Sequence, residues 1–356
     1  MQTSPIHEAN TLIVGAGPIG LELAVALKQA GVDYVHLEAG QLAHTITWYP
    51  KQARFFSSPE RIAIAGVQLV TPDQTKATRE EYLAYLRGVA QQFDLPINTF
   101  EKVTDIKSDR KGGPFQIVSK RGREQRNYLA KHLVLAIGDM HMPRMLHIPG
   151  EDLPHVSHYF DEPNMFFGKR LMIVGGRNSA VEAALRCNRA GAHVSLSFRQ
   201  ANFDPTAVKY WLLPEIEALI KHGQITFFPS TRPVRITQDA VELVSTAQPP
   251  QPKRTVPADF VLLLTGYVQD TTLFDLAGVR LVGENQAPEC DPETMMTNVP
   301  NLFIAGTAAA GTQNRFRLFI ENCHPHVTKI TRAITGHDPA PGLVNPAAKQ
   351  YGLPES

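Results

Sequence analysis

Apolar residues follow two spacings along this chain, and the spacing changes at recurring points. Residues 11–14 are apolar or β-branched without interruption, which is typical of a strand buried on both faces of a parallel sheet. Apolar residues then recur at helical spacing over 21–27, until Gly31 ends the predicted helix. Residues 171–174 and 180–185 repeat this succession before Gly191. The pattern predicts two α/β units, each built on a parallel sheet.

Three further apolar runs complete the predicted sheets. The runs at residues 132–138 and 260–266 both end in glycine, and we expect each of them to close one sheet. The run at 301–306 precedes a predicted helix over 314–334 and returns to the first sheet. We therefore expect two Rossmann-like domains of the three-layer ββα type, one inserted into the other. The predicted boundaries are 1–152 with 288–356 for the discontinuous domain and 153–287 for the inserted domain.

A glycine-rich turn joins the first predicted strand to its helix. Gly15 allows the tight turn, Gly17 lets a pyrophosphate approach the backbone, and Gly20 allows close packing of helix on strand. Pro18 suits the first turn of a helix, and Ile19 completes the motif. Because the helix N-terminus faces the phosphates with partial positive charge, this turn predicts a dinucleotide site.

An acidic residue follows at the distance that such a site requires. The second strand, residues 34–37, ends at Glu38, which lies 18 residues after Gly20 (38 − 20). A carboxylate at about this distance accepts hydrogen bonds from the ribose 2′-hydroxyl. The alternative is a glycine turn that binds no ligand. The strand, the helix and the acid together favour a dinucleotide site over this alternative.

The second glycine-rich turn is less regular. It begins with Gly175, but Arg177 stands where the middle glycine is usual, followed by Asn178 and Ser179. An arginine there adds bulk near the pyrophosphate or pairs with a phosphate. The next strand ends at Arg199 instead of an acid, and an arginine at this point can bind the 2′-phosphate of NADP. A solvated loop arginine is the alternative, and Gly266 ends the last strand of this predicted NADPH domain.

Composition excludes several classes of protein. The 356 residues carry a net charge of +1, and the 35 lysines and arginines are spread along the chain, so nucleic-acid binding is not expected. No apolar run resembles a signal peptide or approaches the length of a membrane helix, and a cytoplasmic protein is expected. The three cysteines Cys187, Cys290 and Cys323 have no metal-binding spacing, and we expect no metal site.

Several segments give the chain a wider resemblance. The first glycine turn, Glu38 and the glycine-ended strands resemble the two-dinucleotide flavoproteins related to thioredoxin reductase. Four segments resemble the bacillithiol disulfide reductase branch more narrowly: FFSSPERI (55–62), IPGEDLP (148–154), VSHY (156–159) and FIEN (319–322). The resemblance spans nearly the whole chain. It implies an oxidoreductase that takes hydride from NADPH onto FAD and then reduces a low-molecular-weight disulfide.

The resemblance also implies residues for each cofactor. Beyond the glycine turn and Glu38, the positions implied to contact FAD are Gln41, Ser57, Val103, Gly138, Gly306 and Thr307. Many relatives have an acid after the glycine equivalent to Gly306, and that acid holds the ribityl chain. Here the residue is Thr307, whose hydroxyl forms hydrogen bonds but carries no charge.

The thiols depart from the family pattern. The chain has no CxxC pair before the second glycine turn, so it is not an ordinary thioredoxin reductase. Relatives of the bacillithiol type typically have a cysteine where this chain has Ile19. Because disulfide exchange needs an attacking thiolate, either Cys323 substitutes, the flavin acts directly, or the acceptor is not a disulfide. Cys323 is the candidate catalytic residue, and its alternative role is core packing.

Three functions remain open from the sequence. The first is the NADPH-dependent reductase with a small-molecule disulfide as acceptor. The second is a single-component flavin monooxygenase, which also uses two dinucleotide turns. The third is a nucleotide-binding redox sensor without catalysis, which Arg177 and the missing cysteine favour. A homo-oligomer is compatible with each of them.

Overall fold

The computed structural model describes residues 5–108, 112–249, 252–313 and 318–345. The chain folds into two compact units. Unit 1 contains residues 1–47, 52–142 and 267–356, and unit 2 contains residues 48–51 and 143–266. The short strands β7 (Met142–Pro143) and β16 (Tyr267–Val268) pair with each other where the chain passes from one unit to the other and returns.

Unit 1 is built on a seven-stranded sheet with the order β3-β2-β1-β6-β5-β4, and β19 also pairs with β6. Its strands are β1 (Ile6–Val14), β2 (Tyr34–Leu37), β3 (Ile97–Asn98), β4 (Lys102–Lys107), β5 (Phe115–Arg121), β6 (Glu124–Leu135) and β19 (Leu302–Ile304). The long strand β6 forms antiparallel pairs with β5 through its first half and parallel pairs with β19 through its second half. Strand β1 pairs with β6 on the opposite edge, in parallel.

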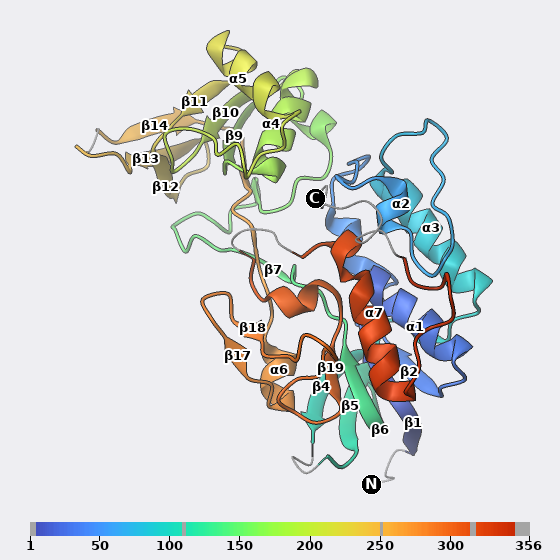
Figure 1. Cartoon of the computed structure of the whole chain (residues 1–356). Helices are drawn as coiled ribbons and strands as arrows, with labels where there is room; N and C mark the ends of the chain where they lie inside the picture. Colours follow the sequence, from blue (N-terminus) through green and yellow to red (C-terminus); the bar gives the residue numbers. More distant parts are fainter. Residues whose placement is uncertain (1–4, 109–111, 250–251, 314–317, 346–356) are drawn as a thin grey trace. The chain divides into compact units, whose positions relative to one another are not determined.

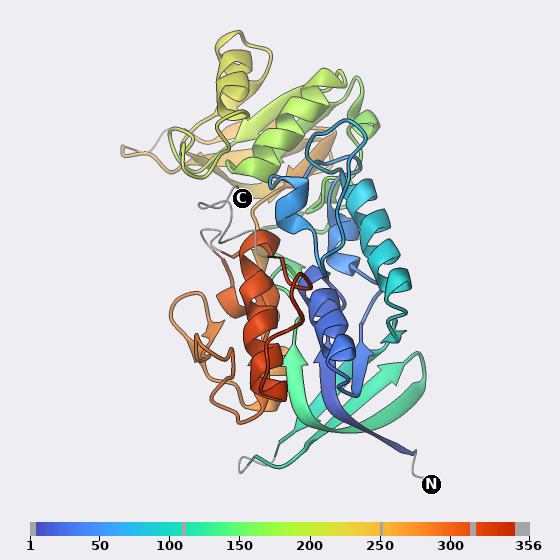
Figure 2. The same cartoon turned by 45° about the vertical axis from the view of Figure 1, so that its right-hand side comes forward.

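Alternating side chains assign the two faces of this sheet. Leu12 and Val14 belong to a core shared with strands β4 and β5, whereas Ile13 between them packs with the helical layer. The helical layer consists of α1 (Pro18–Gln29) and α7 (Ile320–Thr335), which lie side by side in Figure 1 and Figure 2. Period-two alternation therefore gives the central sheet a helical face and a face covered by β strands, as the three-layer prediction requires.

Smaller elements complete unit 1. They are η1 (His44–Trp48), α2 (Pro59–Ile62), α3 (Arg79–Gln92), α6 (Thr272–Ala277), β17 (Leu281–Val282), β18 (Ala287–Pro288) and η3 (Gly306–Ala310). Helix α3 begins with a capping box, because the Thr78 hydroxyl accepts the Glu81 N–H at 3.2 Å and the Glu81 carboxylate accepts the Thr78 N–H at 2.7 Å.

The segment 267–287 packs in unit 1, although the predicted boundaries assigned it to the inserted domain. The reason is its apolar content. Phe274, Ala277 and Val279 are buried in the same core as Leu12. The segment includes the short helix α6, and its sequence does not indicate which of the two sheets it covers.

Unit 2 repeats the three layers. Its parallel sheet has the order β11-β10-β9-β15-β8, and the antiparallel sheet β12-β13-β14 covers one face. The strands are β8 (Val156–Ser157), β9 (Arg170–Val174), β10 (His193–Ser197), β11 (Thr226–Phe228), β12 (Thr231–Ile236), β13 (Ala240–Ser245), β14 (Arg254–Pro257) and β15 (Phe260–Leu263). Its helical elements are η2 (Pro163–Phe166), α4 (Asn178–Arg189) and α5 (Leu213–Lys221).

The same alternation organises unit 2. Leu171 and Ile173 pack in the core that contains the buried face of α4, while Met172 and Val174 pack with residues of β12 and β13. The predicted fold class is therefore confirmed, with parallel sheets in both units. Of the predicted last helix, residues 314–317 lie outside the described residues, and α7 begins at Ile320.

Candidate cofactor sites

The first glycine turn is closely packed on one side and open on the other. Gly15 has φ +106°, and a Cβ added to it would overlap the Ala136 carbonyl oxygen. A Cβ on Gly20 would overlap the Gly15 carbonyl oxygen. In contrast, a Cβ on Gly17 would have nothing within 4 Å. The turn therefore leaves space beside Gly17 and the first N–H groups of α1, which is the cradle that a phosphate group requires.

His36 and Glu38 fix the shape of this turn. The His36 Nε2 lies 2.9 Å from the Gly15 carbonyl oxygen, and burial lowers the pKa of His36 to about 4, so the neutral ring donates this hydrogen bond. Glu38 Oε2 accepts the Ala16 N–H at 2.7 Å, and Oε1 accepts the Gly40 N–H at 2.7 Å. Each carboxylate oxygen keeps a second lone pair, so Glu38 can also accept from a ribose hydroxyl.

The predicted glycines at the ends of β6 and β19 lie next to this turn. A Cβ on Gly306 would lie 3.4 Å from the Ile19 Cβ, and a Cβ on Gly138 would lie 3.9 Å from the Thr307 Oγ1. The Gly306 N–H donates to His326 Nδ1 at 3.2 Å, and burial lowers the pKa of His326 to about 4. Residues from three distant segments therefore meet at the carboxyl edge of the parallel strands, where open α/β sheets bind their ligands.

Two polar residues at this edge were not predicted from the sequence. Asp139 follows Gly138 directly, and its Oδ2 accepts from Gln313 Nε2 at 2.9 Å. Burial raises the pKa of the Asp139 carboxyl, against the lowering effect of the polar side chains of Gln313 and Thr307. Gln269 donates to the carbonyl oxygens of Gly138 and Ala308 at 2.9 and 3.0 Å.

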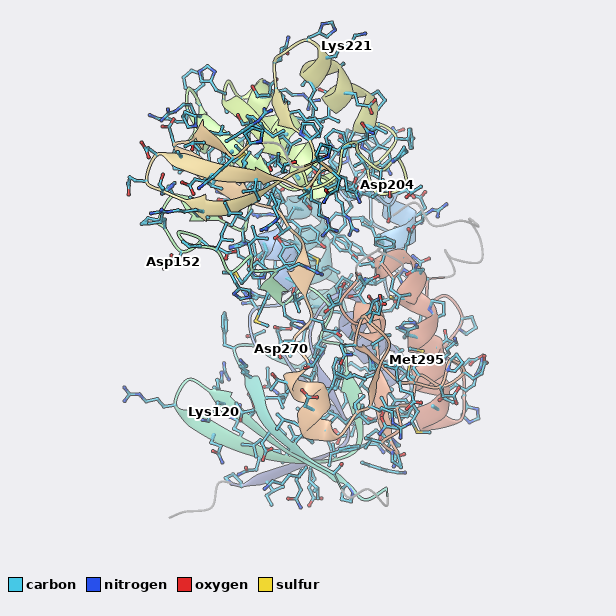
Figure 3. The ribbon with its side chains drawn as sticks, turned by 90° about the vertical axis from the view of Figure 1, so that its left-hand side faces the viewer. Lys120, Asp152, Asp204, Lys221, Asp270 and Met295 are labelled. Atoms are coloured by element: carbon cyan, nitrogen blue, oxygen red, sulfur yellow. The ribbon has the colours of Figure 1, made fainter. Side chains whose placement is uncertain are left out.

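The Gln269 amide has a further property. Its Oε1 is buried and has no hydrogen-bond partner among the described residues. Asp270, labelled in Figure 3, follows Gln269, and its N–H donates to His141 Nδ1 at 3.0 Å. A buried acceptor without a partner fits a site that is completed by a bound group with donors. The signal in the sequence was the position of Asp139 after a strand-ending glycine.

The other residues implied for FAD are placed as follows. Gln41 is exposed, and its Oε1 accepts the Leu42 N–H at 2.9 Å. Ser57 is buried before α2, and Val103 is buried in β4 within the core of unit 1. The backbone near Val103 is tied to the acidic position, because the Glu101 N–H donates to the Glu38 carbonyl oxygen at 2.9 Å.

The second glycine turn differs from the first in its middle position. Gly175 has φ +148°, and a Cβ on it would lie 2.5 Å from the Leu264 carbonyl oxygen and 2.8 Å from the Ala180 Cβ. Arg177 is the N-cap of α4 with φ −115°, an extended conformation that any residue adopts, and its side chain is exposed. The backbone at this position therefore does not need glycine, which explains why an arginine is accommodated.

Side-chain and backbone groups around the second turn form hydrogen bonds with neighbouring loops. Asn178 Oδ1 accepts the Lys209 N–H at 2.9 Å, and the Gly266 carbonyl oxygen accepts the Arg144 N–H at 2.9 Å. Ser179 and Arg199 are exposed, and the Arg199 carbonyl oxygen accepts from Thr246 Oγ1 at 2.7 Å. The Arg199 side chain is thus available at the end of β10 for a ligand.

None of the three cysteines lies in an environment that favours a thiolate. Cys323 is fully buried in α7, and its pKa is raised by burial and by the carboxyl groups of Asp139 and Glu22. Burial raises the pKa of Cys187 to about 12. Cys290 is partly buried, and burial and Asp291 raise its pKa. Disulfide exchange is carried out by thiolates, so these positions are poorly suited to it.

The two three-layer units, each with a glycine turn at the carboxyl edge of its sheet, define a flavoprotein oxidoreductase that uses a pyridine nucleotide. The family model for pyridine nucleotide-disulphide oxidoreductases matches residues 12–306. The chain belongs to this family and is an FAD-dependent oxidoreductase enzyme. Its cofactors are FAD and NAD(P)H. This finding replaces the hypothesis of a sensor without catalysis.

Individual relatives match over most of the chain. The bacilliredoxin reductase Bdr of Bacillus subtilis (strain 168) is 35% identical over 92% of this chain and 98% of the relative. The structure of the bacillithiol disulfide reductase Bdr from Bacillus cereus is 34% identical, with a TM-score of 0.86, and covers 93% of this chain and 99% of that chain. A ferredoxin–NADP reductase of Ignicoccus hospitalis is 28% identical over 83% of this chain and 89% of the relative.

The described part of the chain has neither a metal-binding cluster nor a membrane-spanning helix. Within residues 5–108, 112–249, 252–313 and 318–345, no group of three or more His, Cys, Asp or Glu side chains could hold a metal ion. Among the helices of the same residues, none is long and apolar enough to cross a membrane.

Proposed function

We propose that this enzyme transfers electrons from NADPH through FAD to a low-molecular-weight disulfide such as bacillithiol disulfide, and that no cysteine of its own takes part. The bacillithiol disulfide reductase of Bacillus cereus named above supports the disulfide acceptor, and the bacilliredoxin reductase of Bacillus subtilis supports the reductase activity. The observation that carries the second half of the proposal is the absence of a suitable thiol. Ile19 occupies the glycine-turn position, and all three cysteines have raised pKa values.

FAD, when bound, supplies the two-electron carrier between the nicotinamide and the acceptor. The protein holds it through the first turn. The open face at Gly17 and the N-terminus of α1 suit the pyrophosphate, and Glu38 suits the adenosine ribose. Gly306 lies beside Ile19, and Gly138 lies beside Thr307, so these residues would hold the part of FAD beyond the pyrophosphate.

NADPH is assigned to the second turn. Asn178 and Ser179 begin α4, so the backbone N–H groups there suit the pyrophosphate of NADPH. Arg199 at the end of β10 suits the 2′-phosphate, because a guanidinium forms paired hydrogen bonds to phosphate oxygens. Arg177 is exposed at the N-cap of α4, where its charge adds to this attraction.

The overall reaction consumes one NADPH, one proton and one disulfide, and it gives NADP⁺ and two thiols. The sulfur–sulfur bond breaks, the disulfide is reduced by the two electrons of the hydride, and the second thiol takes its proton from solvent. Because the products are free thiols, we place the reaction in the cytoplasm, where thiols stay reduced. In relatives with a thiol in the glycine turn, a mixed disulfide can form there, but Ile19 forms none.

A second acceptor class is favoured by one comparison. A reductase that delivers electrons to an iron–sulfur protein needs no thiol of its own, and a relative named ferredoxin–NADP reductase matches 83% of this chain. The missing thiol at Ile19 agrees with this acceptor as well as with direct reduction of a disulfide. The two acceptors are separated by experiment.

The test uses the FAD-loaded wild type and a cysteine-free variant, Cys187→Ala/Cys290→Ser/Cys323→Ala. Each protein is reduced anaerobically with NADPH, and reoxidation by bacillithiol disulfide, glutathione disulfide, ferredoxin or oxygen is followed by flavin absorbance. We expect bacillithiol disulfide to reoxidise both proteins at similar rates. Reoxidation of the wild type alone would show that a cysteine is required. Reoxidation by ferredoxin only would select the second acceptor, and reoxidation by oxygen only would favour a monooxygenase.

A second measurement uses the native wild type, so that its result does not depend on correct folding of the variant. The native wild type is treated with an alkylating agent, and the modified cysteines are identified by mass spectrometry. We expect Cys187 and Cys323 to stay unmodified because they are buried. Full disulfide reductase activity after modification of Cys290 supports a reaction without protein thiols, whereas loss of activity in step with modification contradicts it.

A further inference from the structure

An acidic side chain lies across from Thr307, where the sequence alone indicates only a hydroxyl. Leu135 in β6 pairs with Ile304 in β19, so the two strands end side by side. Asp139 follows β6, and Thr307 follows β19. A Cβ added to Gly138, which precedes Asp139, would lie 3.9 Å from the Thr307 Oγ1, so the two residues are neighbours. A carboxylate and a hydroxyl thus form a pair at the carboxyl edge of the sheet.

This pair lies one contact away from the first glycine turn. Gly306 precedes Thr307 and meets Ile19, which belongs to the turn itself. In FAD, the ribityl chain is bonded directly to the pyrophosphate, and it carries several hydroxyl groups. If the pyrophosphate occupies the open face at Gly17, the ribityl chain is the next part of the cofactor along the sheet edge. A polyol at this place requires acceptors and donors close together.

We propose that Asp139 and Thr307 together bind the ribityl chain of FAD, with the carboxyl group supplied from the end of β6 instead of the end of β19. The inference rests on the proposed function, because it assumes that FAD occupies the first turn. Asp139 can accept from a ribityl hydroxyl while it keeps its bond to Gln313, because each carboxylate oxygen has two lone pairs. The Thr307 hydroxyl adds both a donor and an acceptor.

A purely structural role for Asp139 is the competing explanation. Asp139 would then only anchor the Gln313 side chain. Gln313 is already fixed without Asp139, because its Nε2 donates to the Leu318 carbonyl oxygen at 3.0 Å and its Oε1 accepts the Leu318 N–H at 3.0 Å. The Asp139 carboxyl group is therefore not needed to hold the Gln313 side chain, whereas a polyol ligand would use one.

The test measures FAD affinity directly. Apo-protein is titrated with FAD, and binding is followed by quenching of flavin fluorescence, for the wild type and for Asp139→Ala, Asp139→Asn and Thr307→Val. We expect Asp139→Ala to weaken FAD binding by roughly tenfold or more, as the loss of a charge-assisted hydrogen bond does. Asp139→Asn retains an acceptor oxygen, so its FAD affinity should fall less than that of Asp139→Ala. Asp275→Ala is the control, because it removes an exposed carboxyl group of α6 in the same unit, whose Oδ2 accepts from Thr271 Oγ1 at 3.0 Å.

The exchange variant Asp139→Thr/Thr307→Asp sharpens the test. It returns the acid to the end of β19 and keeps the pair, so we expect FAD affinity within about threefold of the wild type. Thermal unfolding of each apo-protein is measured beside the titration. A loss of apo stability in Asp139→Ala with unchanged FAD affinity would overturn the proposal in favour of the structural role.

Failure of this inference is distinguishable from failure of the proposed function. Wild-type protein that binds no FAD would refute the proposed function itself. Wild-type protein that binds FAD but reduces no disulfide would refute the proposed acceptor and leave the ribityl assignment standing. Unchanged FAD affinity in both Asp139→Ala and Thr307→Val would refute only the ribityl assignment.

Discussion

Glu22 of α1 and His324 of α7 form a fully buried pair, with His324 Nδ1 2.6 Å from Glu22 Oε2. The second ring nitrogen, Nε2, lies 2.9 Å from the Arg61 carbonyl oxygen. Both ring nitrogens therefore face acceptors, and only the doubly protonated ring can donate to both. Burial alone would lower the pKa of His324, but Glu22 and the Arg61 carbonyl group raise it above the ordinary value.

This pair gives the first prediction. His324→Gln leaves the Glu22 carboxylate buried without its cation, and we expect it to lower the free energy of unfolding by about 3–5 kcal/mol. Because the folded-state pKa of His324 is raised, its contribution is full below pH 6.5 and is lost as pH rises through the folded-state pKa. Denaturant unfolding across this range should show the wild type and variant converging at high pH. The double variant Glu22→Gln/His324→Gln leaves no buried charge at this pair, so its free energy of unfolding should fall less than that of His324→Gln.

His36 gives a prediction of the opposite sign. Its folded-state pKa is lowered to about 4, against 6.5 for the unfolded chain. The unfolded state therefore binds more protons in this range, and stability falls as pH drops from 6.5 to about 4. The contribution of His36 is up to about 3 kcal/mol. His36→Gln keeps a donor for the Gly15 carbonyl oxygen but does not titrate. Its free energy of unfolding should therefore fall less steeply than that of the wild type as pH drops from 6.5 to about 4. Equal slopes for both proteins would contradict the assignment.

The two glycines of the first turn should respond differently to a methyl group. In Gly20→Ala the Cβ overlaps the Gly15 carbonyl oxygen, and we expect the apo-protein to lose about 1–3 kcal/mol of stability. In Gly17→Ala the Cβ meets no protein atom, so apo stability should change by no more than about 1 kcal/mol. FAD binding should nevertheless weaken in Gly17→Ala, because the methyl group occupies the phosphate position. A stable Gly17→Ala protein with normal FAD affinity would refute the cradle.

Arg199 should determine the preference between the two nicotinamide cofactors. Loss of a hydrogen-bonded charge pair to the 2′-phosphate costs roughly 10- to 100-fold in binding. We therefore expect Arg199→Ala to raise the KM for NADPH by this factor and to leave the KM for NADH nearly unchanged. Lys221→Ala at the end of α5 is the matched control, because it removes an exposed cation from the same unit. An equal loss with both cofactors would show that Arg199 does not bind the phosphate.

The sequence predicted the elements whose signals are local. The strand at Ile13, the turn at Gly15 and the helix after it follow from residue spacing within one short segment, and the structure has them there. Gly306 and Ile19 are both implied for FAD by the sequence, and the structure brings them together. Whether each of these residues binds FAD stays a prediction, which the affinity measurements above address.

Long-range relationships could not be predicted. Asp139 meets Thr307 only because β6 and β19 are neighbours in the sheet, and no spacing along the chain indicates that pairing. Phe274 lies in a short helix whose periodicity is equally compatible with either core. Cys323 is a candidate for catalysis in the sequence because its helix follows the strand that ends at Gly306. Its full burial near Asp139 and Glu22 depends on three-dimensional packing.

The partners Glu22 and His324 are 302 residues apart in the chain, and this separation imposes an order on synthesis at the ribosome. Most of unit 2 is one continuous stretch, residues 143–266, so it can fold before the ribosome has made β19 and α7. Helix α1 must wait, with its apolar side and the Glu22 carboxylate uncovered, for a time on the order of tens of seconds at ordinary translation rates. The incomplete chain, in which unit 2 has folded but β19 and α7 are still missing, is thus the form that depends most on chaperones. A cell that lacks chaperones should accumulate this incomplete chain as aggregate.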